Sequence, residues 1–296
     1  MDKSPFSYKG LLIGTLLSLA IGLLAPYGIV FNYYWIGFNP SSPGALFFFF
    51  VLTFVVNTIV GLLNRRFELA KADLVLIYCM LLMAVTVPTW GLVFFLIGTL
   101  VYPFYYGTSE NNYAELFYDF IPAWMVPQDF QAIKNYYEGL PQGAAIPWAV
   151  WVEPMGWWLS LMIAMSFMLI CMSAILHRQW SVHERLTYPM VQLPQNMIEK
   201  SDDARIAPFF KNKFMWLGFL VPFTLLTLNA LNHYWPIVPQ YSPNGRFSLF
   251  DNTLHLPIAL NLAWVGFFYL VNLEITFSIW FFYVLSKIQE GVLNII

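Results

Sequence analysis

Charged side chains are scarce in this sequence, and their scarcity argues against a soluble fold. Only 10% of the 296 residues are Asp, Glu, Lys or Arg, whereas a soluble domain carries about 25%. The net charge is −2, so the chain offers no strongly basic surface for nucleic acid. Hydrophobic residues make up 59% of the chain, which is typical of membrane proteins with several spans.

Cysteine and histidine are also rare, and no catalytic or metal-binding motif is present. Both cysteines, Cys79 and Cys171, lie in apolar runs, where packing is a commoner role than disulfide formation or metal ligation. The chain has four histidines and no C-x-x-C, H-E-x-x-H, G-x-S-x-G or P-loop pattern. We therefore predict no catalytic residues, no metal site, no cofactor and no enzymatic activity.

Apolar runs long enough to cross a bilayer occur along the whole chain. A hydrocarbon core of about 30 Å needs roughly 20 apolar helical residues. Six runs meet this length, at residues 10–35, 45–63, 73–103, 155–176, 214–235 and 257–286. The sequence thus predicts an all-α, polytopic membrane protein with about six spans.

Positive charges predict the orientation of these spans. With the N-terminus in the cytoplasm, twelve of the 14 Lys and Arg residues lie on the cytoplasmic side, and only Lys134 and Arg246 lie outside. The chain then divides into a first three-span unit (1–103), an extracytoplasmic loop rich in aromatic residues (104–154) and a second three-span unit (155–296) with a cytoplasmic loop at 177–213. The outer loop is either a cap at the membrane interface or a lid over an outward-facing cavity.

Two of the runs, 73–103 and 257–286, are too long for one straight crossing. At 1.5 Å per residue each would be about 45 Å long as a helix. The first contains Pro88, which removes a backbone donor and disfavours helix at the preceding residue. We expect an interruption there, flanked by Thr86 and Trp90, because transporters use such breaks to build binding sites.

The second long run contains polar residues deep in apolar sequence. Glu274 is the only acid deep inside a predicted span, and such a residue costs at least about 2.5–3.5 kcal/mol to insert. It either carries a coupling proton or binds a substrate ammonium, or it is hydrogen-bonded between helices and locks their packing. Together with the first interruption, this run predicts a substrate or ion site formed by Glu274, Asn272, Thr276, Pro88, Thr86 and Trp90.

Several segments resemble the signature of a family of large bacterial integral membrane proteins without an assigned activity. They are "RQW…ERLTYPMVQLP" at 178–194, "ADLVLIYCMLLMAVTVPTWGL" at 72–92, "IPAWMVPQDFQAIKNYYEGLP" at 121–141, "WVEPMGWW" at 151–158 and "LEITFSIWFFYVLSKIQE" at 273–290. That family is remotely similar to the oligopeptide transporter superfamily, whose members move short peptides or metal chelates, typically with protons. Members of the resembled family are about twice as long, so we expect this chain to correspond to an N-terminal half.

These observations favour a secondary transporter, or the N-terminal half of one, for a small polar solute. The resemblance implies short peptides as the first substrate class, proton coupling, and a place in the bacterial inner membrane. The expected partners are the lipid bilayer, the solute, and a C-terminal half or other membrane subunits. The alternative is a non-transporting membrane subunit that anchors partners in a larger complex.

Overall fold

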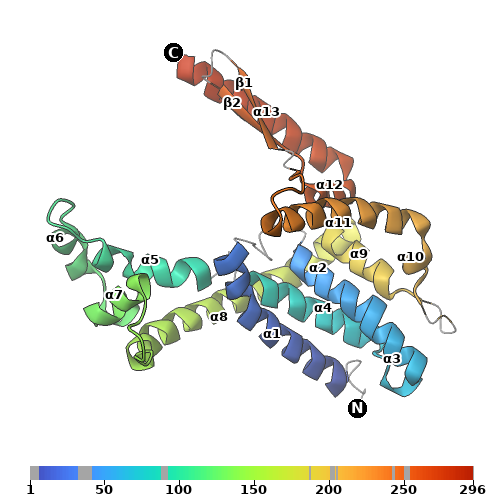
Figure 1. Ribbon diagram of the computed structural model, residues 1–296, viewed down its shortest axis with the longest axis horizontal. Coiled ribbons are helices and arrows are strands. Elements are labelled where there is room, and N and C mark those ends of the chain that lie inside the picture. Colours follow the sequence, from blue (N-terminus) through green and yellow to red (C-terminus); the bar gives the residue numbers. More distant parts are fainter. Residues whose placement is uncertain are drawn as a thin grey trace. The chain divides into compact units, whose positions relative to one another are not determined.

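The computed structural model describes residues 7–32, 42–87, 93–186, 188–200, 204, 206–241, 244–249 and 254–295 (Figure 1). The chain forms two compact units. One consists of Met1–Thr86 together with Thr187–Ile296, and the other is Val87–Leu186. This division is made by contacts within the chain, whereas the three-part organisation predicted from hydropathy concerns membrane crossings and stays a prediction.

The first unit begins with a layer of apolar helices. They are α1 (Tyr8–Asn32), α2 (Pro43–Phe50), α3 (Asn57–Leu63) and α4 (Lys71–Thr86). A π-helical turn, Val51–Val56, joins α2 to α3, and a 3-10 turn, Arg65–Phe67, follows α3. Helix α4 packs against both α1 and α2, which lie beside it in Figure 1.

In the described residues of the remainder of the first unit, the regular elements are helices and one hairpin. Its helices are α9 (Pro189–Ile198), α10 (Pro208–Lys211), α11 (Lys213–Tyr234), α12 (Leu262–Tyr269) and α13 (Leu273–Ile295). Local sequence marks where several of them begin. Pro189 and Pro208 stand in the first turn of α9 and α10, and the side chains of Asn212 and Asn261 cap α11 and α12.

The apolar core of this unit is built mainly from α1, α2 and α4. Phe49, Ile77 and Leu81 are fully buried, and Ile21 of α1 is 1% exposed. Tyr78 extends the core toward α9, because its hydroxyl donates to the carbonyl of Met190 at 2.8 Å. The same cluster includes residues of α9 and α10, so these short helices are held against the first layer.

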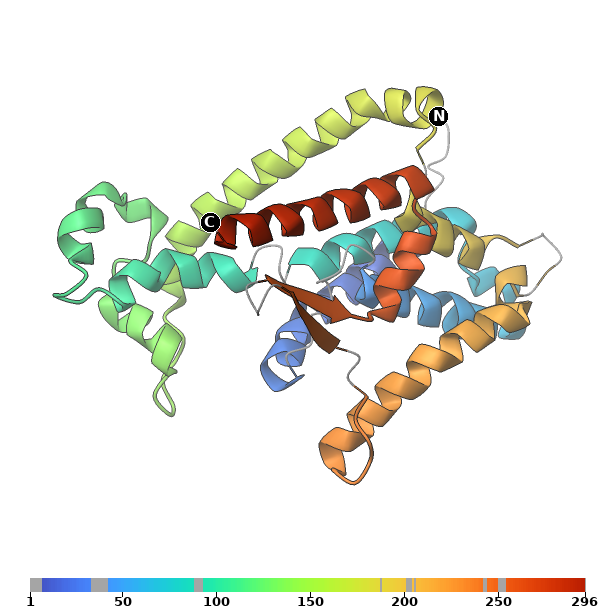
Figure 2. The same ribbon diagram turned by 90° about the horizontal axis from the view of Figure 1, so that it is seen from above.

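The second unit consists of a long helix and a small part rich in aromatic residues that contains α6 and α7, called the aromatic subdomain below. Its helices are α5 (Val93–Tyr105), α6 (Tyr113–Phe117), α7 (Phe130–Glu138) and α8 (Trp148–Arg178). Asp129 caps α7 by accepting hydrogen bonds from the backbone N–H groups of Gln131 and Ala132. Figure 2 shows α8 as one long helix that leads away from the subdomain.

In the described part of the chain, four helices are long and apolar enough to cross a membrane. They are Tyr8–Tyr27, Pro43–Leu63, Trp148–His183 and Lys213–Tyr234, and they coincide with four of the six apolar runs. The helical fold is therefore confirmed, and the length and composition of these helices support the membrane class, while the number of about six spans stays a prediction. Pro88 and Trp90 lie outside the described residues, so the expected interruption at this proline stays a prediction as well.

A β-hairpin between α11 and α12 was not predicted from the sequence. Strands β1 (Asn244–Leu249) and β2 (Leu254–Ala259) pair in antiparallel register, from Asn244 opposite Ala259 to Leu249 opposite Leu254. The hairpin is a small addition to a fold that is otherwise helical in the described residues, and the predicted run 257–286 begins in its second strand. Composition did not reveal the hairpin because it is an isolated two-stranded pair, which depends on its surroundings for stability.

Candidate functional site

The second candidate span contains a wide helical turn with buried polar side chains. Thr53 lies in the π-helical turn and Asn57 directly follows it, and each is 6% exposed. The Thr53 hydroxyl donates to the carbonyl of Phe49 at 2.8 Å, and the Thr58 hydroxyl donates to the carbonyl of Thr53 at 3.3 Å. Such single π turns inside α-helices are frequent at functional sites. The turn therefore brings polar groups into an otherwise apolar helix.

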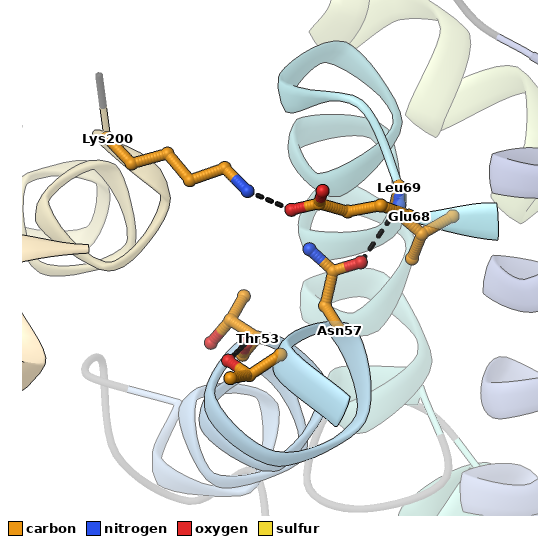
Figure 3. Close-up of polar contacts among 6 residues, drawn as sticks. Thr53, Asn57, Glu68, Leu69 and Lys200 are labelled. Atoms are coloured by element: carbon orange, nitrogen blue, oxygen red, sulfur yellow. Dashed lines mark hydrogen bonds and ion pairs between the residues drawn. The ribbon is translucent and has the colours of Figure 1, made fainter. Parts of the chain in front are cut away.

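Asn57 connects this helix to the turn before α4. Its Oδ1 accepts a hydrogen bond from the backbone N–H of Leu69 at 2.8 Å (Figure 3). Leu69 is itself buried, so its N–H group has little access to water as an alternative partner. The amide of Asn57 thus fixes the backbone at Leu69, just before α4.

An ion pair joins the same turn to the segment after α9. The Nζ of Lys200 donates to Oε1 of Glu68, and Figure 3 shows the lysine reaching across to the carboxylate. The Glu68 side chain is 21% exposed and that of Lys200 is 29% exposed. A Cβ atom on Gly61 would lie 3.2 Å from Cδ of Glu68, so the glycine leaves room for the carboxylate.

Two cavities adjoin this ion pair. The larger has a volume of about 430 Å³, and the charged residues that line it are Arg65, Glu68, Lys71 and Lys200. The smaller, of about 20 Å³, is lined by residues that include Thr53, Asn57, Thr58 and Lys200. Its volume corresponds to about one water molecule. The turn, the buried amide and the ion pair therefore surround one polar region of the first unit.

A buried acid connects the N-terminus of α1 to α4. Asp73 is 3% exposed, and its carboxylate accepts from the backbone N–H of Ser7 at 2.6 Å and from the Ser7 hydroxyl at 2.8 Å. The hydroxyl oxygen of Ser7 in turn accepts from the N–H of Gly10 at 3.3 Å. These bonds satisfy donors at the start of α1 that the helix itself leaves unpaired.

Three of the residues predicted to form a binding site lie within five consecutive positions, at the start of α13. Helix α12 ends at Tyr269 and α13 begins at Leu273, so Asn272 directly precedes α13 and Glu274 is in its first turn. The Thr276 hydroxyl donates to the carbonyl of Asn272 at 3.2 Å. Glu274 and Thr276 are in the described part of the chain, and neither lines the two cavities described above.

The other predicted residues belong to the end of α4 and beyond. Thr86 is the last residue of α4, and its hydroxyl donates to the carbonyl of Leu82 at 2.8 Å. Pro88 and Trp90 are among the residues that the structure does not describe. The proposed meeting of these three residues with Glu274 is therefore a prediction that the geometry leaves open.

Sequence reasoning missed the polar region around Asn57. The available signal was the presence of Thr53, Asn57 and Thr58 inside the apolar run 45–63. Polar residues within a span commonly face protein or a cavity rather than lipid. Glu68 and Lys200 gave no comparable signal, because each stands in a polar connection and they are 132 positions apart.

Comparison with known proteins identifies the family of the chain. No curated protein and no solved structure matches it. Residues 2–296 match a family described as a family of unknown function (DUF6785). The match covers nearly the whole chain, and it confirms the resemblance to a family without an assigned activity. The chain therefore belongs to this family of unknown function, DUF6785.

Proposed function

We propose that the chain is a secondary transporter, or the N-terminal part of one, that moves a small polar solute together with protons. Short peptides are the first substrate class to test, because the sequence resembles a family remotely similar to oligopeptide transporters. The proposed location is the bacterial plasma membrane. The proposal includes about six crossings, with α4 and α5 forming one interrupted crossing and α12 and α13 the other.

The observation that carries this proposal is the break between α12 and α13. Three residues separate the two helices, and Glu274 follows in the first turn of α13. At membrane depth, a helix break leaves backbone groups that need partners from protein or from a water-filled cavity. Transporters place substrate and ion sites at such breaks. A carboxylate beside this break is therefore a candidate for the coupling residue.

In the proposed mechanism, Glu274 takes up and releases the coupling proton. Asn272 offers an amide to the polar solute, and Thr276 is tied by its hydroxyl to the backbone of the break. Thr86, Pro88 and Trp90 form the facing half of the site. Movement of one half against the other then exposes the site to each side of the membrane in turn.

A simpler arrangement makes a different prediction for Glu274. Helix α13 has 23 residues, and at 1.5 Å per residue it is about 35 Å long, enough to cross the core alone. Glu274 would then lie at the membrane edge, where an acid in the first helical turn is stabilised by the helix dipole. The two arrangements are separated by thiol labelling of Glu274→Cys in a variant that lacks Cys79 and Cys171. A membrane-impermeant reagent should label position 274 as fast as a loop residue only if this position lies at the membrane edge.

The function itself is tested by ligand-dependent stability and by uptake. Purified protein is heated in detergent with di- to tetrapeptides, amino acids or metal chelates at two pH values. A ligand that binds only the folded state stabilises it by about 2.7 kcal/mol at one hundred times Kd. Active ligands are then tested for proton-driven uptake into proteoliposomes.

Two variants of α13 make this test specific. Glu274→Gln should abolish the pH dependence of binding and of uptake. Glu290→Gln is the matched control, because Glu290 is on the same helix and pairs with Lys287 at 2.5 Å. Uptake that keeps its pH dependence in Glu274→Gln would refute the coupling role, and the absence of any stabilising ligand for the wild type would count against transport.

A non-transporting membrane subunit is the second candidate. It is favoured by α8 and α11, whose apolar stretches are not buried within the chain. A helix that is apolar all round requires lipid or other helices around it. Mild-detergent purification with mass measurement tests this candidate: a stoichiometric partner complex together with no ligand response would support the subunit role.

A further inference from the structure

The larger polar cavity of the first unit has the size and charge of an anion-binding site. Its volume of about 430 Å³ falls in the range of roughly 300–1,000 Å³ that is common for small-molecule sites. Three cationic side chains, Arg65, Lys71 and Lys200, line it together with one carboxylate, Glu68. Among the residues that the structure describes, the lining therefore carries two more positive than negative charges.

The fold brings these cations together from three places in the chain. Arg65 begins the 3-10 turn after α3, Lys71 begins α4, and Lys200 follows α9. The hydrogen bond from Leu69 to Asn57 fixes the backbone between Arg65 and Lys71. The cavity is therefore a product of the tertiary structure, and the buried hydrogen bond between Leu69 and Asn57 fixes part of its wall.

The cavity also adjoins the end of a candidate membrane span. Gly61, which helps to line it, lies two residues before the end of the span Pro43–Leu63. The positive charges on this side led us to predict that it faces the cytoplasm. Basic pockets at this level of a membrane protein are suited to the phosphates of anionic lipids.

We propose that this cavity binds a phosphate group, carried by an anionic lipid or by a soluble phosphate ester. A phosphate offers more acceptor oxygens than a carboxylate, and its oxygens suit a guanidinium fork as well as lysine ammonium groups. A doubly charged phosphate balances the excess of two positive charges. The site is separate from the proposed transport residues, so its test does not depend on whether the chain transports a solute.

The ion pair within the cavity gives the proposal a distinctive signature. Glu68 pairs with Lys200, so an entering phosphate competes with this carboxylate for the lysine. Neutralising Glu68 should therefore strengthen binding, whereas neutralising Arg65 or Lys71 should weaken it. A merely structural role of these residues would not produce changes of opposite sign.

The experiment measures lipid and phosphate binding to the full chain in detergent. Native mass spectrometry and thermal stability are recorded with phosphatidylglycerol, with phosphatidylcholine as the uncharged reference, and with glycerol 3-phosphate as the soluble probe. The variants are Arg65→Gln, Lys71→Gln and Glu68→Gln. Lys213→Gln is the control, because Lys213 starts α11 and is a cation on the same predicted side that does not line the cavity.

We expect Arg65→Gln and Lys71→Gln each to weaken phosphatidylglycerol binding about tenfold, which corresponds to about 1.4 kcal/mol. Glu68→Gln should tighten binding, and Lys213→Gln should leave it unchanged. A response to phosphatidylglycerol alone assigns the site to a lipid head group, and a response to glycerol 3-phosphate as well assigns it to phosphate esters in general. Equal weakening in Lys213→Gln, weaker binding in Glu68→Gln, or no preference for phosphatidylglycerol and glycerol 3-phosphate over phosphatidylcholine overturns the proposal.

Discussion

Replacing Asn57 by alanine should destabilise the protein by about 1–3 kcal/mol. The substitution removes the acceptor of the 2.8 Å hydrogen bond from the backbone N–H of Leu69. Both residues are buried, at 6% and 7% exposure, so water does not readily take over the bond. A buried donor left without a partner costs about 1–3 kcal/mol. For a chain of this size, each kcal/mol lowers the melting temperature by roughly 2–4 °C.

Asn64 provides a matched control in the same turn. Its Oδ1 also accepts from a backbone N–H, that of Arg66 at 3.0 Å, but Asn64 is exposed and water can replace it. Asn64→Ala should therefore cost less than Asn57→Ala, about 0.5 kcal/mol at the low end for an exposed cap. Thermal unfolding of both variants in the same detergent measures the difference.

A third variant separates the hydrogen bond from the space that alanine leaves. Asn57→Leu keeps a side chain of similar size but has no acceptor, so it should remain destabilised. If Asn57→Leu is as stable as the wild type, the cost of Asn57→Ala comes from a cavity rather than from the hydrogen bond. If Asn57→Ala costs no more than Asn64→Ala, the role assigned to this amide is wrong.

Two further predictions concern α1 and the aromatic subdomain. Gly10→Ala should destabilise the protein by about 1–3 kcal/mol, because the added Cβ would lie 2.6 Å from Oδ1 of Asp73. Gly22→Ala should be neutral or stabilising by up to about 1 kcal/mol, because nothing lies within 4 Å of its added Cβ. Thermal unfolding of the two variants tests this, and equal effects would contradict it. Burial and neighbouring tyrosines raise the pKa of Tyr137 above the usual 10.0, and its hydroxyl donates to the carbonyl of Gly98 at 3.0 Å. Because the folded state holds this proton more tightly than the unfolded chain does, stability should fall as the pH rises above 10.0, the usual tyrosine value. Tyr137→Phe should reduce that loss in alkaline unfolding curves, and an unchanged curve would refute the assignment.

The membrane class of the chain was readable from composition because hydropathy is a local property. A span needs only about 20 consecutive apolar residues, whatever its neighbours are. Four of the six predicted runs are long apolar helices in the structure. Caps were likewise local, as the Asp129 cap of α7 illustrates, since an N-cap requires only the residues of the first turn.

The features of the candidate sites differ in how far they could be predicted from the sequence. Glu274 was singled out because an acid in an apolar run is costly without a role; its role stays a prediction, and the structure places it in the first turn of α13. The hairpin Asn244–Ala259 was missed, because strand pairing joins residues whose individual propensities are weak. Asp73 was missed as a buried acid because its partner, Ser7, lies 66 positions away.

Hydropathy and charge along the chain were enough to predict a helical membrane protein and its orientation, because each depends on a short stretch of residues. Two contacts could be found only in the tertiary structure: the ion pair between Glu68 and Lys200 and the hydrogen bond from Leu69 to Asn57. Such contacts form only when separate helices pack, and packing is decided by the shapes of many side chains together. The polar cavity of the first unit exists for the same reason: Lys200 is far from Arg65 and Lys71 in the sequence and joins them only in the fold.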